Sequence, residues 1–355
     1  MEDSLRYQLP IRDYTLDDPI NNASLLPLDN GRHSLEPVHG LGDLEKLPPE
    51  ILDTILNQLD IRTLTDFRLV NQRAMQAVDS IPQYRMIVAH APIALRAVLS
   101  IGTARLVSCQ VIYDKLCTAE CGTCGDFGGY LYLVICERVC FSCFTDHPRF
   151  LPVSQENALL MFGLRRAHLE GVPTVKTVAG IYSKDRHRLK RRITLYDPFA
   201  LRKVGISVHG SSIELDEYVS EVNEELRDQY WFEYDEYEAG RRTKKPRYAR
   251  RWDREREIEL GLLKESTDPK RFVAVVRAPF VNLAKTDPKE WGFHCIACQG
   301  HWGPSPINYR RKFTEESFRG HVEECGEIVN GRHASSTDLC SIICQCRNQP
   351  VQGVE

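Results

Sequence analysis

The segment from Leu47 to Val78 constrains the fold of this chain most, because its apolar residues recur at the spacing of an α-helix. Pro49 suits a first helical turn, where a missing N–H costs nothing, and Glu50 suits the positive end of a helix dipole. The apolar residues that follow predict a first helix, and they are Ile51, Leu52, Ile55, Leu56 and Leu59.

Two further short helices are predicted in the same segment. Asp60 is a turn or cap residue before the second helix, and Asn71 interrupts the apolar stripe after it. A third helix covers Arg73 to Val78, and Pro82 terminates it. Adjacent apolar pairs make the stripe wider than one core-facing seam requires, so one face is expected to pack on the chain and another on a partner.

These residues resemble the F-box family, which carries Leu-Pro-x-Glu-Ile/Leu at the start of its first helix and Leu-x-x-x-Arg/Leu-Val-Asn/Cys through its second. The matching positions are Leu47, Pro48, Glu50, Ile51, Leu59, Leu64, Arg68, Leu69, Val70 and Asn71. The chain departs from the family in the third helix, where Met75 or Val78 stands in place of a frequent Trp.

The resemblance implies that this segment docks the Skp adaptor, and through it a cullin, in an SCF-type ubiquitin ligase. The remaining residues would then recognise a protein substrate for the ubiquitin conjugation pathway, without catalysis of their own. The adaptor-binding residues implied are Leu47, Pro48, Pro49, Ile51, Leu52, Ile55, Leu56, Leu59, Leu64, Leu69 and Val70.

Composition limits the classes of protein to which the chain can belong. The 355 residues carry a formal net charge of −3, which recommends neither nucleic acid nor an anionic membrane as a general partner. The first residues, MEDSLRYQLP, lack the pattern of a signal peptide, and no run of eighteen apolar residues occurs. The thirteen cysteines are clustered, which favours reduced, metal-binding thiols in the cytoplasm or the nucleus.

A first metal site is predicted from the spacing C-x2-C-x15-C-x2-C, formed by Cys121, Cys124, Cys140 and Cys143. Gly122 and Gly125 permit the tight turns that place two thiolates on one ion. The apolar run Tyr130 to Ile135 predicts a strand between the pairs, so the unit is expected to be a zinc-ribbon-like hairpin. Four sulfur ligands leave no open position, and the zinc is therefore expected to be structural.

Neighbouring residues leave a shifted ligand set open, because Cys117, Cys136 and His147 each lie four residues from one of the four cysteines. The interleaved ligand spacing of a RING finger is missing. The Cys-rich sequence at this distance from the helical segment resembles a group of fungal F-box proteins with a Cys-rich insert.

A second zinc site is predicted from C-x2-C-x22-H-x3-C, formed by Cys295, Cys298, His321 and Cys325. Thr314 is a good helix cap, Gly326 suits the helix end, and His321 and Cys325 lie at i and i+4 on one helical face. Phe293 and Phe318 are expected to form the core of this finger-like unit. Its loop exceeds the roughly twelve residues of a C2H2 finger, so His301, Cys340, Cys344 and Cys346 stay open as alternative ligands.

DNA reading by this finger is disfavoured because its helix is acidic, with one arginine, Arg319, against Glu315, Glu316, Glu323 and Glu324.

A separate charged segment precedes the finger in the sequence. Residues 214–238 contain eleven acidic residues and one basic residue, and a basic run follows directly. We interpret the pair as a solvated helical extension. The alternative is a nuclear-import or nucleic-acid patch at Arg241, Arg242, Lys244, Lys245 and Arg247.

The predicted fold class is α+β. The predicted order is a disordered leader at 1–43, an F-box at 44–82, a mixed α+β region at 83–210 containing the Cys-rich unit at 117–147, a charged helical segment at 211–270, a zinc-finger-like region at 271–330 and a Cys-containing tail at 331–355. Within the mixed region, a strand is expected at 106–113, a helix capped by Ser154 at 154–166, and strands at 175–181 and 193–196.

The function predicted is that of a non-catalytic substrate receptor of a ubiquitin ligase with two structural zinc ions. No phosphate loop or nucleophile elbow occurs, and the isolated histidines His90, His168, His187 and His209 form no catalytic pattern. The alternative is a zinc-dependent nucleic-acid or chromatin-associated protein that uses the basic run 241–254. The substrate is not readable from any motif.

Overall fold

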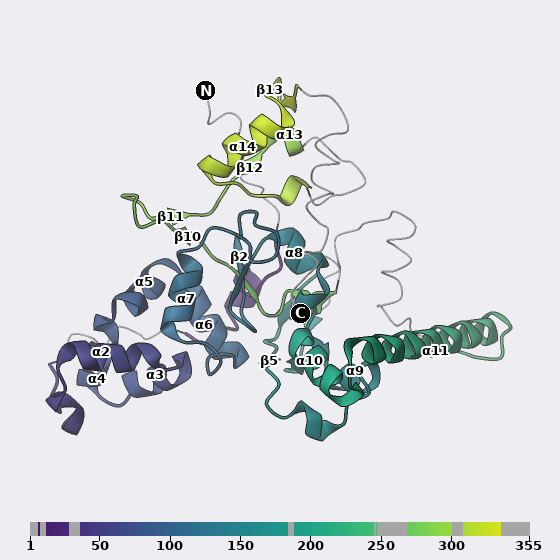
Figure 1. Cartoon of the computed structure of the whole chain (residues 1–355), viewed down its shortest axis with the longest axis horizontal. Helices are drawn as coiled ribbons and strands as arrows, with labels where there is room; N and C mark the ends of the chain where they lie inside the picture. Colours follow the sequence, from purple (N-terminus) through teal and green to yellow (C-terminus); the bar gives the residue numbers. More distant parts are fainter. Residues whose placement is uncertain are drawn as a thin grey trace.

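The computed structural model describes residues 6–7, 12–27, 36–183, 188–244, 246, 268–299 and 308–334. Peripheral helices surround small antiparallel sheets, and the predicted α+β class is confirmed (Figure 1). The three helices between residues 49 and 80 lie at one end of the molecule, and a small finger-like unit, which contains residues 294–333, lies at a second end. A long helix, at 212–238, projects at a third end.

The three predicted N-terminal helices are present as α2 (Pro49–Gln58), α3 (Ile61–Arg68) and α4 (Gln72–Ser80). Asp60 caps α3 by accepting a hydrogen bond from the Thr63 N–H, and Asn71 caps α4 through the Ala74 N–H. Buried Arg68 forms an ion pair with Asp79 at 2.8 Å, which joins α3 to α4. Met75 and Val78, in the positions of the family's Trp, are buried.

Three more helices continue this region: α5 (Pro82–His90), α6 (Pro92–Ile101) and α7 (Cys109–Leu116). The strand expected at 106–113 is wrong, because α7 occupies most of it. The Ser108 hydroxyl accepts a hydrogen bond from the Val111 N–H, and Cys109, Ile112 and Leu116 bury one helical face. A short apolar run in a sequence is compatible with either a strand or a helix. Here, burial of one helical face favours the helix.

A central three-stranded antiparallel sheet, in the order β3-β2-β9, consists of β3 (Glu137–Val139), β2 (Tyr130–Tyr132) and β9 (Val275–Arg277). The strand expected at 130–135 is shorter, because the chain turns after Tyr132 and Cys136 takes a positive φ of 50°. The middle strand is buried on both faces. The main core of the chain contains this strand together with Leu56, Ile61 and Leu64, so the N-terminal helices and the sheet share one apolar core.

A second sheet, in the order β4-β8-β5, joins β4 (Val153–Ser154), β8 (Thr194–Tyr196) and β5 (Thr174–Lys176). Ser154 caps α9 (Gln155–Met161) as predicted, but this helix ends earlier than expected, and Gly163 has a φ of 60°. The helices α10 (Pro198–His209) and α11 (Ser212–Glu238) pack with α9 around a separate small core.

The remaining described strands and α-helices are short, except for the 11-residue helix at 315–325. They are β1 (Arg6–Tyr7), α1 (Pro19–Asn22), α8 (Phe141–Asp146), β6 (Gly180–Ile181), β7 (Arg188–Leu189), β10 (Phe280–Val281), β11 (Lys289–Glu290), β12 (His294–Cys295), α13 (Ile296–Gln299), α14 (Glu315–Cys325), β13 (Ile328–Val329) and β14 (Arg332–His333). Among the described helices none alone has the length and apolarity to cross a membrane. Taken together, α5 and α6 reach both, but the pair is bent by 96°.

The disordered leader expected at 1–43 is wrong for residues 12–27, which pack into the main core. Leu16 is buried, and its N–H donates to the Val275 carbonyl at 2.9 Å. The Asn21 side chain exchanges two hydrogen bonds with the backbone of Ile181. Strand β1 pairs with β12, so the start of the chain also meets the finger-like unit. These partners lie far away in sequence, which is why local polarity suggested disorder.

The Asp13–Arg310 ion pair, at 2.7 Å, joins the N-terminal segment to the C-terminal region with both side chains buried. We expect Asp13→Asn to lower the free energy of unfolding by roughly 3–5 kcal/mol, because it leaves the Arg310 charge buried without its carboxylate. The exposed pair Arg62–Asp66 provides the control, since Asp66→Asn should cost about 0.5 kcal/mol or less. Urea unfolding of both variants measures the difference, and equal losses would contradict this assignment.

Candidate functional site

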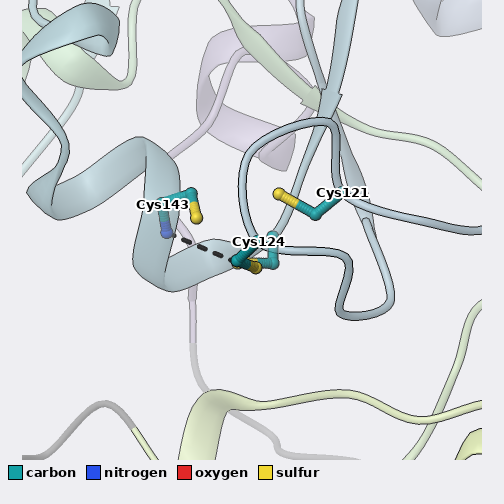
Figure 2. A group of neighbouring side chains, drawn as sticks. Cys121, Cys124 and Cys143 are labelled. Carbon is teal, nitrogen blue, oxygen red and sulfur yellow. Dashed lines mark hydrogen bonds between the residues drawn. The ribbon is translucent and has the colours of Figure 1, made fainter. Parts of the chain in front are cut away.

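The four cysteines of the first predicted metal site come together in the structure. Their sulfur atoms all lie within 4.8 Å of one another. Figure 2 shows Cys121, Cys124 and Cys143 with their side chains directed toward a common point. The Sγ atoms of Cys124 and Cys140 are 3.6 Å apart, far beyond the disulfide bond length of about 2.0 Å.

Two local backbone features create this cluster. The loop after Cys121 closes through the hydrogen bond from the Gly125 N–H to the Cys121 carbonyl, and Gly125 has a φ of 79°, which glycine adopts without strain. On the other side, Cys140 is the N-cap of α8, and its Sγ accepts a hydrogen bond from the Cys143 N–H. The C-x2-C pairs therefore occupy a tight turn and a helix start.

The cluster's electrostatics favour a cation. The neighbouring thiols of Cys124, Cys140 and Cys143 lower the pKa of Cys121 well below its ordinary value, so one thiolate is favoured. Hydrogen bonding with Cys121 is the leading cause that raises the pKa of Cys140, and also that of Cys143. The cluster by itself therefore favours one thiolate, at Cys121, and four thiolates would need a positive ion between them.

The alternative ligands at this site lie outside the cluster. The Cys117 thiol interacts with the Tyr113 hydroxyl, and burial raises the pKa of the Cys136 thiol to about 12. The His147 Nδ1 accepts the Arg149 N–H and so caps a short turn. None of the three belongs to the metal-sized group found among the described residues.

The second cluster contains Cys295, Cys298, His321 and His333, all buried and with ligand atoms within 4.8 Å of one another. The Cys298 Sγ lies 3.4 Å from the His321 Nε2 and 3.6 Å from the His333 Nε2. The Cys295 Sγ lies 3.5 Å from the same His333 nitrogen. Two cysteines and two histidines therefore surround one point.

The expected fourth ligand, Cys325, is not in this cluster, and His333 takes that place. The Cys325 Sγ contacts the Nδ1 of His321 at 3.5 Å, on the opposite ring edge from the Nε2 that faces Cys298. The i, i+4 spacing places His321 and Cys325 on one face of the helix. It does not determine whether the Cys325 sulfur points to the centre of the cluster or to the other edge of the His321 ring. Cys325 instead contacts the far side of the His321 ligand ring.

A tight hairpin brings His333 back to the cluster. Asn330 and Gly331, with positive φ values of 50° and 74°, connect β13 to β14. The His333 Nδ1 lies 2.9 Å from the Gly326 carbonyl, which leaves Nε2 for the centre. The Asn-Gly turn between two short strands was the sequence signal that could have identified this ligand. The boundary expected at residue 330 falls inside this unit.

The finger-like core forms around aromatic rings. Phe293 and Phe318 pack with centroids 5.1 Å apart, as expected, and Phe313 stacks on the His321 ring at 4.5 Å. Thr314 caps α14, as predicted. The other alternative ligands, His301, Cys340, Cys344 and Cys346, lie outside the described residues.

The distances in both clusters test whether zinc fits. Tetrahedral zinc, with bonds of about 2.3 Å to sulfur and about 2.0 Å to nitrogen, holds neighbouring ligand atoms roughly 3.3–3.8 Å apart. The measured separations of 3.4–3.6 Å match this geometry. Both clusters can therefore hold a metal ion, and their sulfur and imidazole donors suit zinc.

The residues expected to bind an adaptor divide into three groups. The most exposed apolar side chains are Leu69 at 71%, Val70 at 69%, Ile51 at 48% and Ile55 at 41%. Pro48 and Pro49 are also exposed, whereas Leu47, Leu52 and Leu59 are half-buried. The assignment of Leu56 and Leu64 to the adaptor face is wrong, because both are buried in the main core.

A family model described as the F-box domain matches residues 44–86, which span α2 to α4 and the first half of α5. The protein contains an F-box. No curated protein and no solved structure matches the chain. The F-box match covers the residues that carried the resemblance, and the boundary predicted at residue 82 lies close to the matched end.

The predicted nuclear-import residues lie partly within the described chain. Arg241 forms an ion pair with Glu236 and Arg242 with Glu233, each at 2.7 Å, and Lys244 is exposed. Lys245 and Arg247 lie outside the described residues. The import function stays a prediction.

The two candidate ligand sets at the second centre predict different metal contents. We expect His333→Ala to lose one metal ion per chain, because three ligands remain. Cys325→Ala should keep both ions when metal is in excess, with affinity lowered by about 10–100-fold through the weakened support of His321. Elemental analysis of the purified variants measures the content. Loss of an ion in Cys325→Ala but not in His333→Ala would restore the original ligand set.

Proposed function

We propose that this F-box protein is a non-catalytic substrate receptor, which docks a Skp adaptor of a cullin-RING ligase and binds a target through its zinc-stabilised body. The observation that carries the proposal is that the F-box buries some of its apolar side chains in the main core and leaves others exposed. One side enters the main core through Leu56, Ile61 and Leu64. Ile51, Ile55, Leu69 and Val70 are instead exposed to solvent.

Exposed apolar side chains of this size favour a protein partner. Large side chains gain about 1.5–3 kcal/mol each when they are fully removed from water. Ile51 and Ile55 lie one turn apart on α2, and Leu69 and Val70 directly follow α3. An adaptor that covers them would gain binding energy, and the core contacts of the F-box would not change.

The F-box is joined rigidly to the rest of the chain. The Ile61 N–H donates to the Val107 carbonyl at 2.9 Å, and Asp60 pairs with Ser108 in a β-bridge. These bonds fix the start of α3 against the segment before α7. A target held by the body would therefore keep a defined orientation relative to the adaptor, which transfer of ubiquitin to a fixed site requires.

Zinc at both centres would be structural. Four protein ligands fill each site, so no coordination position remains for water or substrate. The first ion would hold the loop at 121–125 to α8, and the second would join β12 and α13 to α14 and β14. The described cysteines form no disulfide bonds, which supports our proposal that the protein acts in a reducing compartment, the cytoplasm or the nucleus.

Replacement of exposed F-box side chains should separate adaptor binding from folding. We expect the double variant Leu69→Ala/Val70→Ala to weaken adaptor binding more than tenfold and to leave the unfolding midpoint nearly unchanged, because both side chains are exposed. Binding to purified Skp adaptor by calorimetry measures the effect.

The control replaces exposed apolar residues elsewhere, Ile213→Ala with Val329→Ala, at 69% and 54% exposure. This variant should bind the adaptor like the original protein. Unchanged binding in the F-box variant would refute the docking proposal.

Metal removal provides the second test of this function. Elemental analysis should find two zinc ions per chain, and a chelator should lower the melting temperature by roughly 10 °C or more, because metal binding is coupled to folding. Readdition of zinc under reducing conditions should restore it. A chelated chain that melts at the original temperature would show that the ions stabilise nothing.

A further inference from the structure

A basic surface lies where α6, β5 and the segment between β7 and β8 meet. Helix α6 packs against β5, and β5 pairs with β8. Residues 91–107, 171–183 and 188–194 form this region, and together they contain seven basic residues and no acidic residue, a charge of +7. These three stretches therefore do not balance their own charge.

The cations of this surface are accessible to a partner. Six exposed basic residues of the surface form no ion pair within the described part of the chain. They are Lys176, Arg188, Lys190, Arg191, Arg192 and Arg105. Elsewhere in the fold, Arg68, Arg277 and Arg310 are each paired with a carboxylate. The carboxylates that would neutralise the basic surface can therefore come from another molecule.

Hydrogen bonds hold the basic segment in place. Thr177 is buried, its N–H donates to the Ile193 carbonyl at 3.0 Å, and its hydroxyl accepts the Ile193 N–H at 3.0 Å. The same hydroxyl donates to the Arg191 carbonyl. The Arg192 guanidinium donates to the Ser100 carbonyl at the end of α6. This part of the backbone is therefore ordered before a partner binds, which lowers the entropic cost of binding.

A surface hollow adjoins the basic segment. Its volume is about 220 Å³, and it is lined by Arg62, Leu99, Gly102, Ala104 and Arg105. Ser100, which accepts the hydrogen bond from Arg192, follows Leu99 directly in the chain. A cavity needs only about 10–15 Å³ to hold a water molecule, so this hollow has room for a side chain of a partner. Arg105 offers a carboxylate a charge-assisted hydrogen bond there.

Exposed aliphatic side chains lie beside these charges. Leu26 is 50% exposed, and its N–H donates to the Ser100 hydroxyl at 2.8 Å. Ile193, next to Arg192 in the chain, is 39% exposed. The one aromatic residue of the three stretches, Tyr182, is buried. Single-stranded nucleic acid stacks its bases on exposed aromatic rings, so this surface suits a protein segment better.

We propose that this basic surface binds an acidic segment of a partner protein that also carries aliphatic side chains. Carboxylates of the segment accept charge-assisted hydrogen bonds from Lys190, Arg191 and Arg105. Its aliphatic side chains cover Leu26 and Ile193 and remove them from water. The assignment of this partner as the captured target rests on the proposed function.

The basic surface is separate from the adaptor face. Arg62 stands in the first turn of α3, whereas Leu69 and Val70 directly follow the last turn of this helix. A rise of 1.5 Å per residue places Arg62 and Leu69 about 10 Å apart along the helix axis. Loss of one binding activity therefore does not require loss of the other.

Peptide binding to the full chain tests the proposal. The probe is a fluorescent peptide of four Glu-Glu-Leu repeats, and anisotropy measures its affinity. We expect Lys190→Gln/Arg191→Gln to weaken binding about fivefold, because two exposed ion pairs with the peptide are lost. The matched control, Lys289→Gln/Arg319→Gln, also removes one exposed lysine and one exposed arginine, on β11 and α14, and should change the affinity less than twofold.

The hollow and the charge of the ligand are tested separately. Arg105→Gln should weaken binding of the acidic peptide about threefold. A peptide of four Gln-Gln-Leu repeats should bind at least tenfold more weakly than the acidic probe, and added salt should weaken binding of the acidic probe, because salt screens exposed charges.

Each result decides for or against this surface. Equal losses in the Lys190/Arg191 variant and its control would reduce the effect to net charge and overturn the proposal. Tighter binding of oligouridine than of the acidic peptide, or dimers of the chain that the Lys190/Arg191 variant loses, would assign the surface to nucleic acid or to a second copy and also overturn it.

Adaptor binding is measured in the same samples. If the adaptor binds while the acidic peptide does not, the basic surface is wrong and the receptor function stands. If the peptide binds as expected while the adaptor does not, the receptor function is refuted and the basic surface is supported.

Discussion

The buried guanidinium of Arg138 is the interaction on which the arrangement of this molecule depends. Its nitrogens donate to carbonyls of Lys115 and Leu116 at the end of α7, of Gly128 in the first metal unit, and of Ala278 and Pro279 after β9. Burial lowers its pKa to about 10, so it stays charged at neutral pH. One cation thus satisfies carbonyl groups from three distant segments that would otherwise be buried unpaired.

The same principle recurs at the other junctions of the fold. Arg271 is buried and donates to the carbonyls of Phe144 and His147, at the end of α8. Arg310 reaches Asp13 and lies 3.9 Å from the centroid of the Phe141 ring. Short strands and small sheets bury too little apolar surface to order these loops alone, so charged hydrogen bonds supply the missing constraints, and ions at the two Cys/His clusters would add to them.

This construction joins the F-box to the two Cys/His clusters of the chain. The F-box shares its core with the sheet that holds the first metal centre. The N-terminal segments contact both parts, because β1 pairs with β12 beside the second cluster and the Leu16 N–H donates to the Val275 carbonyl in β9. Among the described elements, the distal half of α11 extends away from this framework (Figure 1).

The sequence by itself determined the features that depend on neighbours a few residues apart. The F-box helices with their caps at Asp60 and Asn71, the C-x2-C turns and the α+β class are of this kind, since local hydrogen bonds and helical spacing specify them. Tertiary structure decided that residues 12–27 join the core, that Leu56 and Leu64 face inward, and that His333, after an Asn-Gly turn, joins Cys295 and Cys298 in place of Cys325. Each of these outcomes depends on contacts between segments remote in sequence, whose direction a residue pattern does not encode.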